Sequence, residues 1–383
     1  MATELTTIPP PLTIRRRRFA ASSVVLWVIL GLLIIAPVVS FLLLATSPRL
    51  FQQGPQYFTL RYVAQAFQGS TGQGIFDSLW VSLTVSVVAV IVATAFAWLI
   101  QRTNVYGRRV WAVLMWLLLI VPTWMMTLGW SDLLQPYGAA SFLGVNTHFI
   151  YGEFFGPLGI VIVLSTAALP FAYFVIAAGL RGLGSEFEDA ARIHGANRWR
   201  TLQTVLPIIA PALLSAFAIS FAETMSDFGV AFTLGYHAHF PMATFTLFNA
   251  ISNFPANFSV AAVIAIVLIL STIPPIILQS RVMRRRSYAV LSGRSRPARR
   301  REFRPLRRVA ATAGVGMIFL IALGIPVFGA VAGSFVSNLG IYSSSPVRLS
   351  LAFYHQVLHP RRLGERRLDL ADRSGHETGL ARQ

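Results

Sequence analysis

Long apolar runs separated by short polar segments dominate the chain. Seven of these runs are long enough to cross a bilayer, because about 20 apolar helical residues span its hydrocarbon core. Six of the seven runs contain no charged residue, and the fifth contains two carboxylates, Glu223 and Asp227. The predicted spans are 24–45, 78–101, 110–131, 154–180, 206–234, 258–279 and 309–336. The pattern therefore predicts an all-α polytopic membrane protein.

The composition excludes several other classes. Of 383 residues, 55% are hydrophobic and 12% charged, whereas a soluble domain carries about 25% charged residues. The chain contains no cysteine, and all 32 basic residues are arginine. Disulfides, thiolate metal sites, a P-loop lysine and a lysine Schiff base are therefore excluded. If ATP drives this protein, we expect the nucleotide to bind another chain.

The net charge of +18 is better explained by membrane orientation than by nucleic-acid binding. Arginines cluster in the N-terminal segment and in 101–109, 181–205 and 281–308, which together hold 23 of them. The alternate loops, up to residue 360, hold 3. Cytoplasmic loops of membrane proteins are rich in arginine. We therefore predict a cytoplasmic N-terminus, a cytoplasmic linker 281–308, and no nucleic-acid partner.

A short internal repeat indicates a duplicated unit. Segment 58–67 follows the first span and aligns without gaps with 349–358, which follows the seventh. The predicted organisation is an N-terminal cytoplasmic segment 1–23, a six-span unit 24–280, an Arg-rich linker 281–308, the one-helix start of a second repeat 309–360, and a disordered or aberrant tail 361–383. We expect the second half to be truncated or frame-shifted, and the glycine-rich face of the seventh span to be exposed at the edge of the bundle.

The loop 181–211 is more elaborate than a connection between spans requires. Ser185 and Glu188 have the spacing of a capping box, and three acids stand in the first turn of the helix that it would begin. Ala190 and Ala191 allow close approach to a partner surface, and Gly195 breaks the helix. Pro207 suits the first turn of the next helix. A merely structured connection is the alternative interpretation.

This loop resembles the EAA loop of binding-protein-dependent ABC importer permeases with the type I, methionine-importer-like fold. Asp189-Ala190-Ala191 stands where the family has Glu-Ala-Ala, and Gly195 matches after three residues. Nine residues later come Val205, Leu206 and Pro207, one residue short of the family spacing. The resemblance covers about residues 20–358. It implies that 185–207, including Glu188, forms a coupling helix that docks on a separate ATPase subunit.

The resemblance also implies partners, a location and a substrate class. The segment 222–229, which contains Glu223, Thr224, Asp227, Phe228 and Gly229, resembles a signature of the iron(III) permease branch. The implied partners are an ABC ATPase, a periplasmic or extracellular substrate-binding protein, and a second permease half or a second copy. The implied location is the bacterial inner (plasma) membrane. Related branches import polyamine, thiamine, sulfate or phosphonate, and these substrates remain alternatives.

Glu223 and Asp227 have an interpretation that does not depend on the family. They are four residues apart, so they share one face of a helix. Ionisable groups within a span are costly and usually face the bundle interior or a water-filled path. The functional interpretation is a cation-accommodating or gating position on the translocation path. The alternative is packing, with the acids capping unwound backbone or bonding to neighbouring helices.

Other candidate sites carry weaker signals. His237 and His239 could ligate a metal, but a solvated loop explains them as well, so no metal, cofactor or catalytic residue is predicted. A proton-coupled secondary transporter would use Glu223 and Asp227 without needing an ATPase. A membrane-embedded transferase or hydrolase would need a carboxylate or histidine cluster at a membrane face, which the outer loops lack. The favoured interpretation is a transport subunit that is not itself an enzyme.

Overall fold

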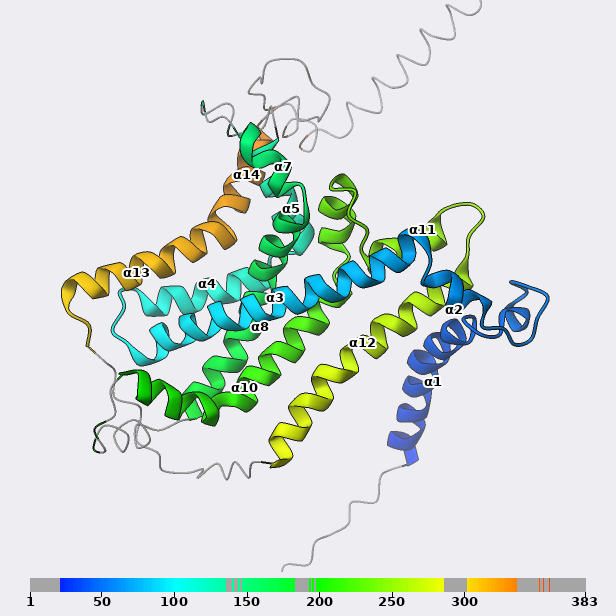
Figure 1. The fold of residues 1–383 in the computed structure, drawn as a ribbon, viewed down its shortest axis with the longest axis horizontal. Helices are drawn as coiled ribbons and strands as arrows, with labels where there is room; N and C mark the ends of the chain where they lie inside the picture. The colour runs from blue at the N-terminus through cyan, green and yellow to red at the C-terminus, as the bar shows by residue number, and fades with distance from the viewer. Residues whose placement is uncertain are drawn as a thin grey trace, which may run out of the picture.

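The computed structural model describes residues 21–135, 140, 144, 147–182, 193, 195, 198–285, 302–335, 351, 354 and 358. This part of the chain is helical and contains no strand (Figure 1). The elements are α1 (Ala21–Leu43), η1 (Pro48–Phe51), α2 (Arg61–Ala66), α3 (Gly69–Arg102), α4 (Arg108–Ile120), α5 (Thr123–Leu134), α7 (His148–Phe154), α8 (Pro157–Gly182), α10 (Arg198–Ser226), the π-helix η2 (Ala231–Gly235), α11 (Ala243–Ser252), α12 (Phe258–Arg285), α13 (Pro305–Phe319), the π-helix η3 (Leu320–Gly324) and α14 (Ile325–Ser334). The all-α fold class is confirmed.

The helices match the predicted membrane spans, with two corrections. Among the described residues, six helices are long and apolar enough to cross a membrane, and the pair α4–α5 makes a seventh. The third span is not one helix, because α4 and α5 meet at an angle of 97°. The break lies at Val121 and Pro122, which both have extended ψ values. Proline removes an amide donor and disfavours the helical conformation of the residue before it.

The fifth span is also shorter than predicted. The prediction of a continuous helix over 206–234 is wrong, because α10 ends at Ser226. Asp227 and Phe228 are not helical, and the helix resumes at Gly229 and passes through η2. Asp227 bonds to the backbone of this second helix, so the acid that the apolar run contains marks the place where the helix stops.

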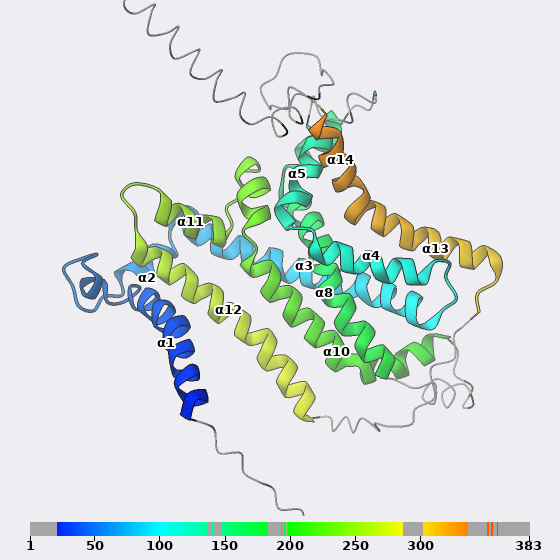
Figure 2. The ribbon, with the colours of Figure 1, turned by 180° about the vertical axis from the view of Figure 1, so that it is seen from behind.

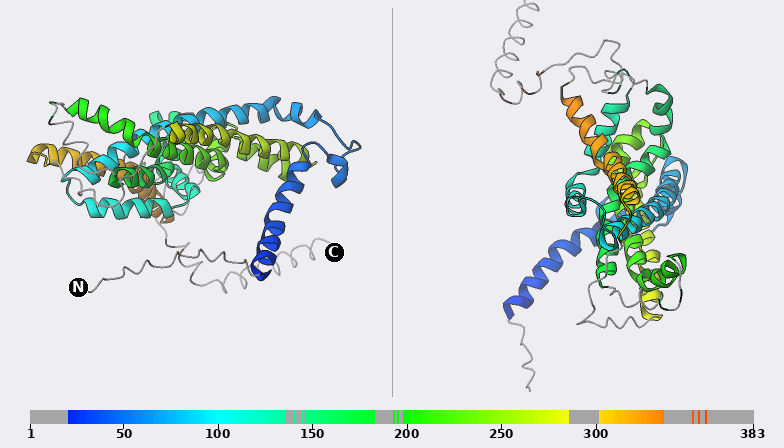
Figure 3. Two further views of the ribbon diagram at one scale, coloured as in Figure 1. Left: turned by 90° about the horizontal axis from the view of Figure 1, so that it is seen from below. Right: turned by 90° about the vertical axis from the view of Figure 1, so that its left-hand side faces the viewer.

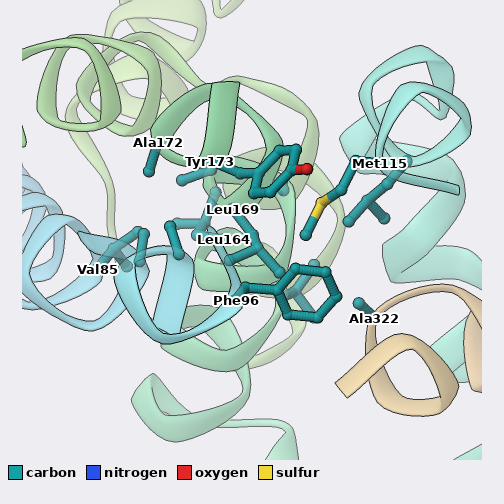
Figure 4. Packing of buried hydrophobic residues seen from close by; sticks show 14 of the residues in the cluster. Val85, Phe96, Met115, Leu164, Leu169, Ala172, Tyr173 and Ala322 are labelled. Atoms are coloured by element: carbon teal, nitrogen blue, oxygen red, sulfur yellow. The ribbon is translucent and has the colours of Figure 1, made fainter. Parts of the chain in front are cut away.

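The core lies where α3 and α8 pack side by side and α10 packs against both (Figure 1). The buried residues of α3 recur every three or four positions and therefore form one face of the helix. Half of them are glycine, alanine or serine, which lets helices approach closely. At the centre Phe96 makes edge-to-face contacts with Tyr173 and Phe319, at centroid distances of 5.9 and 5.2 Å. Figure 4 shows Phe96 and Tyr173 gathered with Met115, Leu164 and Leu169.

The first and seventh spans meet the bundle very differently. α1 projects away from the other helices (Figures 2 and 3), and none of its apolar window is buried. It contacts the bundle near its C-terminal end, where Phe41, Leu44 and Ala45 join a small cluster with α2 and α12. In contrast, α13 and α14 follow α4 and α5 along the surface of the bundle (Figure 1).

The sequence predicts an exposed glycine face on the seventh span. The structure does not show such a face along α14. Cβ atoms built at Gly129 and Gly329 would lie 1.9 Å from the carbonyl oxygens of Pro326 and Gly129, respectively. A Cβ at Gly333 would lie 2.6 Å from a carboxylate oxygen of Asp132. The backbones of α5 and α14 are therefore in direct contact, which only glycine permits. Of the predicted glycines, Gly314 alone has open space around it. The expectation is therefore wrong for α14, because α5 of the first unit supplies the close neighbour.

Candidate coupling loop and translocation site

The structure describes only part of the candidate coupling loop. α8 ends at Gly182 and α10 begins at Arg198. Glu188, Asp189, Ala190 and Ala191 lie outside the described residues. Gly195 is described and exposed, and its φ is +72°. A Cβ atom built at Gly195 would have no neighbouring atom within 4 Å. That left-handed conformation favours glycine, so the loop needs a glycine at the position where the sequence analysis expected a helix break.

The three residues that end the motif belong to α10. Val205 is fully buried in the core, whereas Leu206 is exposed. Pro207 lies well inside α10, which begins at Arg198. The expectation that Pro207 opens the next helix is therefore wrong. Prolines occur within membrane helices because neighbouring groups satisfy the freed carbonyls. The motif thus runs from the loop into the first turns of the fifth span, which leads away toward Glu223.

Arg102 anchors the start of the loop. This arginine ends α3 and is 3% exposed, and its guanidinium donates a hydrogen bond of 2.9 Å to the carbonyl of Leu180. Leu180 stands in the last turn of α8, where carbonyl groups have no partner within the helix. A cation is favoured there by the helix dipole as well. From the sequence, Arg102 is only one of the predicted cytoplasmic charges. Its burial could not be foreseen, because it depends on the packing of α3 against α8.

The turn between α3 and α4 also holds the start of the seventh span. The amide of Phe303 donates to the side-chain carbonyl of Asn104 at 3.0 Å, and the amide of Tyr106 donates to the Thr312 hydroxyl at 3.1 Å. The Arg308 guanidinium lies 3.6 Å from the centroid of the Tyr106 ring. The structure therefore brings together, at one end of the bundle, three segments that the arginine distribution assigns to one side of the membrane.

Asp227 is enclosed by hydrogen bonds. Its carboxylate accepts the amide of Val230 at 2.8 Å, the amide of Ala231, and the hydroxyl of Thr123. Its backbone carbonyl accepts the hydroxyl of Thr244 at 2.7 Å. An aspartate that binds amides two to four residues ahead caps the start of a helix. These contacts support the packing alternative for Asp227.

Glu223 lies one turn earlier on the same side of α10. It is partly exposed, between Ile219 and Ser226, which are both exposed. This part of α10 belongs to a candidate span. A carboxylate on the open face of a span is too costly to face lipid, so a path or another protein chain is the expected neighbour. Beyond it, partly exposed rings of Phe228, Phe232 and Phe248 contact one another.

No metal site stands out in the part of the chain that the structure describes. Within it, no three histidine, aspartate or glutamate side chains lie close enough to hold a metal ion. The ring of His237 is 2.6 Å from the carbonyl of Thr233 through Nδ1, which is a local contact within the helical segment that follows Asp227.

Comparison with known families identifies the class of protein. Residues 86–288 match the family described as binding-protein-dependent transport system inner membrane component, and the chain belongs to this family. It is therefore an inner-membrane, multi-pass permease component of the ABC transporter type. The matched region runs from α3 through the loop after α8 to the end of α12.

Relatives with different named substrates share this region. A Haemophilus influenzae protein described as a ferric transport system permease is 24% identical over 306 residues, which are 78% of this chain and 47% of that protein. The sulfate permease CysT of Escherichia coli is 30% identical over 49% of this chain and 69% of its own. The molybdenum permease ModB of Haemophilus influenzae is 31% identical over 40% and 68%. The chain thus spans about half the length of the ferric relative.

Solved structures support the same fold. A chain from the crystal structure of a bacterial alginate ABC transporter, bound to a periplasmic protein carrying an alginate pentasaccharide, superposes with a TM-score of 0.53 at 16% identity. The superposition covers 69% of this chain and 93% of that chain. At this identity the likeness supports the arrangement of helices alone.

Proposed function

We propose that this chain is a transmembrane permease subunit of an ATP-driven importer. It forms part of the translocation path and is coupled to a separate ATPase subunit through the loop 185–207. A substrate-binding protein outside the membrane delivers the substrate, and a second permease half or a second copy completes the path. The N-terminus and the linker 281–308 face the cytoplasm. The main support is the family match over 86–288; within it, Gly195 has a φ of +72°, a backbone conformation that favours glycine.

Iron(III) is the proposed substrate. A relative that matches 78% of this chain is described as a ferric permease, and the segment 222–229 resembles the signature of that branch. Glu223 adds a negative charge on the open face of α10, which suits a cation better than an oxyanion. Sulfate, molybdate, polyamine, thiamine and phosphonate are the alternatives that the assay below must include.

A proton-coupled secondary transporter is the alternative from another class. It would need an acid that takes up and releases protons along the path. Asp227 is poorly placed for that role, because it is buried and its carboxylate is already engaged by the amide of Val230 at 2.8 Å as the cap of the following helix. Glu223 could still serve, so the energy source must be measured directly.

The proposal is tested by reconstituting the chain with its ATPase and binding protein and measuring ATP hydrolysis. Ferric iron on the binding protein should stimulate hydrolysis more than sulfate, molybdate or an organic cation does. Gly195→Glu should abolish the stimulation, because a side chain at φ +72° strains the loop and adds charge at the docking surface. Glu223→Gln should lower transport about tenfold, as expected when a charge contact of about 1.4 kcal/mol is lost, while protein abundance stays unchanged.

Gly144→Glu provides the matched control. Gly144 has a φ of +75° and open space around it, like Gly195, but lies in the predicted outer loop 132–156. The same substitution there should strain the backbone equally and leave stimulated hydrolysis intact. Normal stimulation in Gly195→Glu, or equal loss in both variants, would refute the coupling assignment.

A further inference from the structure

Two membrane spans are interrupted, and their interruptions are in contact. The third span breaks at Val121 and Pro122, where α4 ends and α5 begins at Thr123. The fifth span breaks at Asp227 and Phe228. These breaks are about 100 positions apart in the sequence, yet Thr123 bonds to Asp227. α5 also packs against η2, the helical segment that follows the second break.

The Asp227 carboxylate holds three chain segments together. It caps the helix that resumes after α10, through the amides of Val230 and Ala231. It also accepts the hydroxyl of Thr123, the first residue of α5. The side chain is 8% exposed, so water competes little for these bonds.

Gly229 shows how tightly the two breaks fit. A Cβ atom built on Gly229 would lie 2.5 Å from the Thr123 hydroxyl oxygen and 2.9 Å from the amide nitrogen of Trp124. These distances are too short for any side chain, so the backbone of the fifth span rests directly on the first turn of α5. A contact made by backbone and a buried carboxylate positions its partners more firmly than contact between flexible side chains does.

α4 is anchored to other parts of the bundle. Trp116 packs on Phe174 of α8 with ring centroids 4.3 Å apart, and Trp111 stacks on Phe319 of α13 at 5.4 Å. α5 instead packs against α14 through Gly129 and Gly329. Between the α13 and α14 contacts lies the π-helix η3, a type of irregularity often found at functional sites in helices. The third span is interrupted between α4 and α5, and the seventh span is irregular at η3, between the parts that contact α4 and α5.

We propose that Asp227 acts as a clasp that makes α5 move together with the outer end of α10, with Val121 and Pro122 as the hinge between α5 and α4. Asp227 is a positioning residue in this device. Because α14 packs on α5, the clasp extends the moving unit to the seventh span. The cause of the motion rests on the proposed function, in which the ATPase displaces the start of α10 near Gly195. The clasp itself depends only on the contacts described above.

The test uses pairs of spin labels on single introduced cysteines, because the natural chain contains none. One pair joins α5 to α10 at Leu128 and Ile219, and the other joins α4 to α5 at Val113 and Leu128; all three side chains are exposed. Distances are measured in the reconstituted complex, without nucleotide and with ATP under conditions that prevent hydrolysis. The clasp predicts one narrow Leu128–Ile219 distance in both states and a Val113–Leu128 distance that changes between them.

Variants of Thr123 and Asp227 test whether the contact between them keeps α5 at a fixed distance from α10. Thr123→Val keeps the shape of the side chain and removes its hydroxyl, while Thr123→Ser keeps the hydroxyl as the matched control. Thr123→Val and Asp227→Ala should both lose the single narrow Leu128–Ile219 peak, and Thr123→Ser should retain it. If Asp227→Ala does not fold, the Thr123 pair still gives the answer.

The possible outcomes separate this inference from the proposed function. An unchanged Leu128–Ile219 peak in Thr123→Val would overturn the clasp, whatever ATP does to the complex. A lost peak in Thr123→Val, with a Val113–Leu128 distance that does not respond to ATP, would establish the contact but refute the hinge motion. Failure of ferric iron to stimulate hydrolysis would affect the proposed substrate and leave the distances as they are.

Discussion

The first and seventh spans are both strongly apolar but differ in how they pack. The α1 window is the more apolar, with a mean hydropathy of 2.8 against 2.4 for the span containing α13 and α14. Yet none of the α1 window is buried, whereas 28% of the other is. Hydropathy therefore identifies a helix that can enter the membrane but does not show where the helix packs. Lipid tails are as apolar as leucine, so helix association in a membrane depends on close fit.

The close fit of the seventh span comes from glycine and aromatic contacts with α3, α4 and α5 that α1 does not make. α14 brings Gly329 and Gly333 against α5, and α13 brings Phe319 between Phe96 and Trp111. In α1 the only glycine is Gly31, where a Cβ would meet nothing but Ile35 of the same helix, at 4.0 Å. The comparison indicates that small and aromatic residues with matching partners decide where a span packs, and three variants can test this.

The largest effect is expected at the glycine contact. Gly329→Ala should force α14 away from α5, because the new Cβ would lie 1.9 Å from the carbonyl oxygen of Gly129. We expect a loss of about 3 kcal/mol in the free energy of unfolding, at the upper end for an overpacked site, measured by thermal melting in detergent. Gly314→Ala, at a site with open space in the same span, should not destabilise the protein. Equal melting of the two variants would refute the glycine contact.

An intermediate effect is expected at the aromatic contact. Phe319→Ala would remove a buried ring that contacts Phe96 and Trp111. The expected loss is about 2 kcal/mol, less than the ~3–5 kcal/mol of a water-soluble core, since lipid tails replace part of the contact. Met317→Ala, where the side chain is exposed, is the control for changes in helix propensity. A stability unchanged by Phe319→Ala would show that α13 does not dock as described.

The smallest effect is expected in α1. Leu32 and Leu33 are 70% and 71% exposed, so replacing both with alanine should change the stability of the purified chain by less than about 0.5 kcal/mol. Melting in detergent under the same conditions as for Gly329→Ala provides the measurement. A loss as large as that of Phe319→Ala would mean that α1 packs on the bundle, and the contrast between the two spans would disappear.

Much of this fold could be predicted from the sequence. The positions of the seven spans follow from the apolar runs, and the break at Pro122 agrees with the known effect of proline on the preceding residue. Gly195 could also be singled out, because a glycine at the end of a predicted helix often takes a left-handed conformation. These features depend on local sequence, so the physical causes are visible in a short window.

The remaining features depend on contacts between distant segments. The end of α10 at Ser226 follows from the bonds of Asp227 to Val230 and Thr123. From the sequence, capping of unwound backbone by Asp227 is only one of two interpretations, because the partner Thr123 lies in a distant segment. The docking of α14 needs Gly129, which precedes Gly329 by 200 positions in the chain. The burial of Arg102 likewise depends on the carbonyl of Leu180 in another helix. No periodicity in one segment can reveal such pairs.

The energy source for uptake tests the central claim most directly. The chain is reconstituted in lipid vesicles with its ATPase and with the binding protein carrying ferric iron, or whichever solute stimulates hydrolysis most. The proposed function predicts that uptake requires ATP and continues when a protonophore collapses the proton gradient. Uptake that follows a proton gradient in vesicles without the ATPase would contradict the claim and would favour a secondary transporter acting through Glu223.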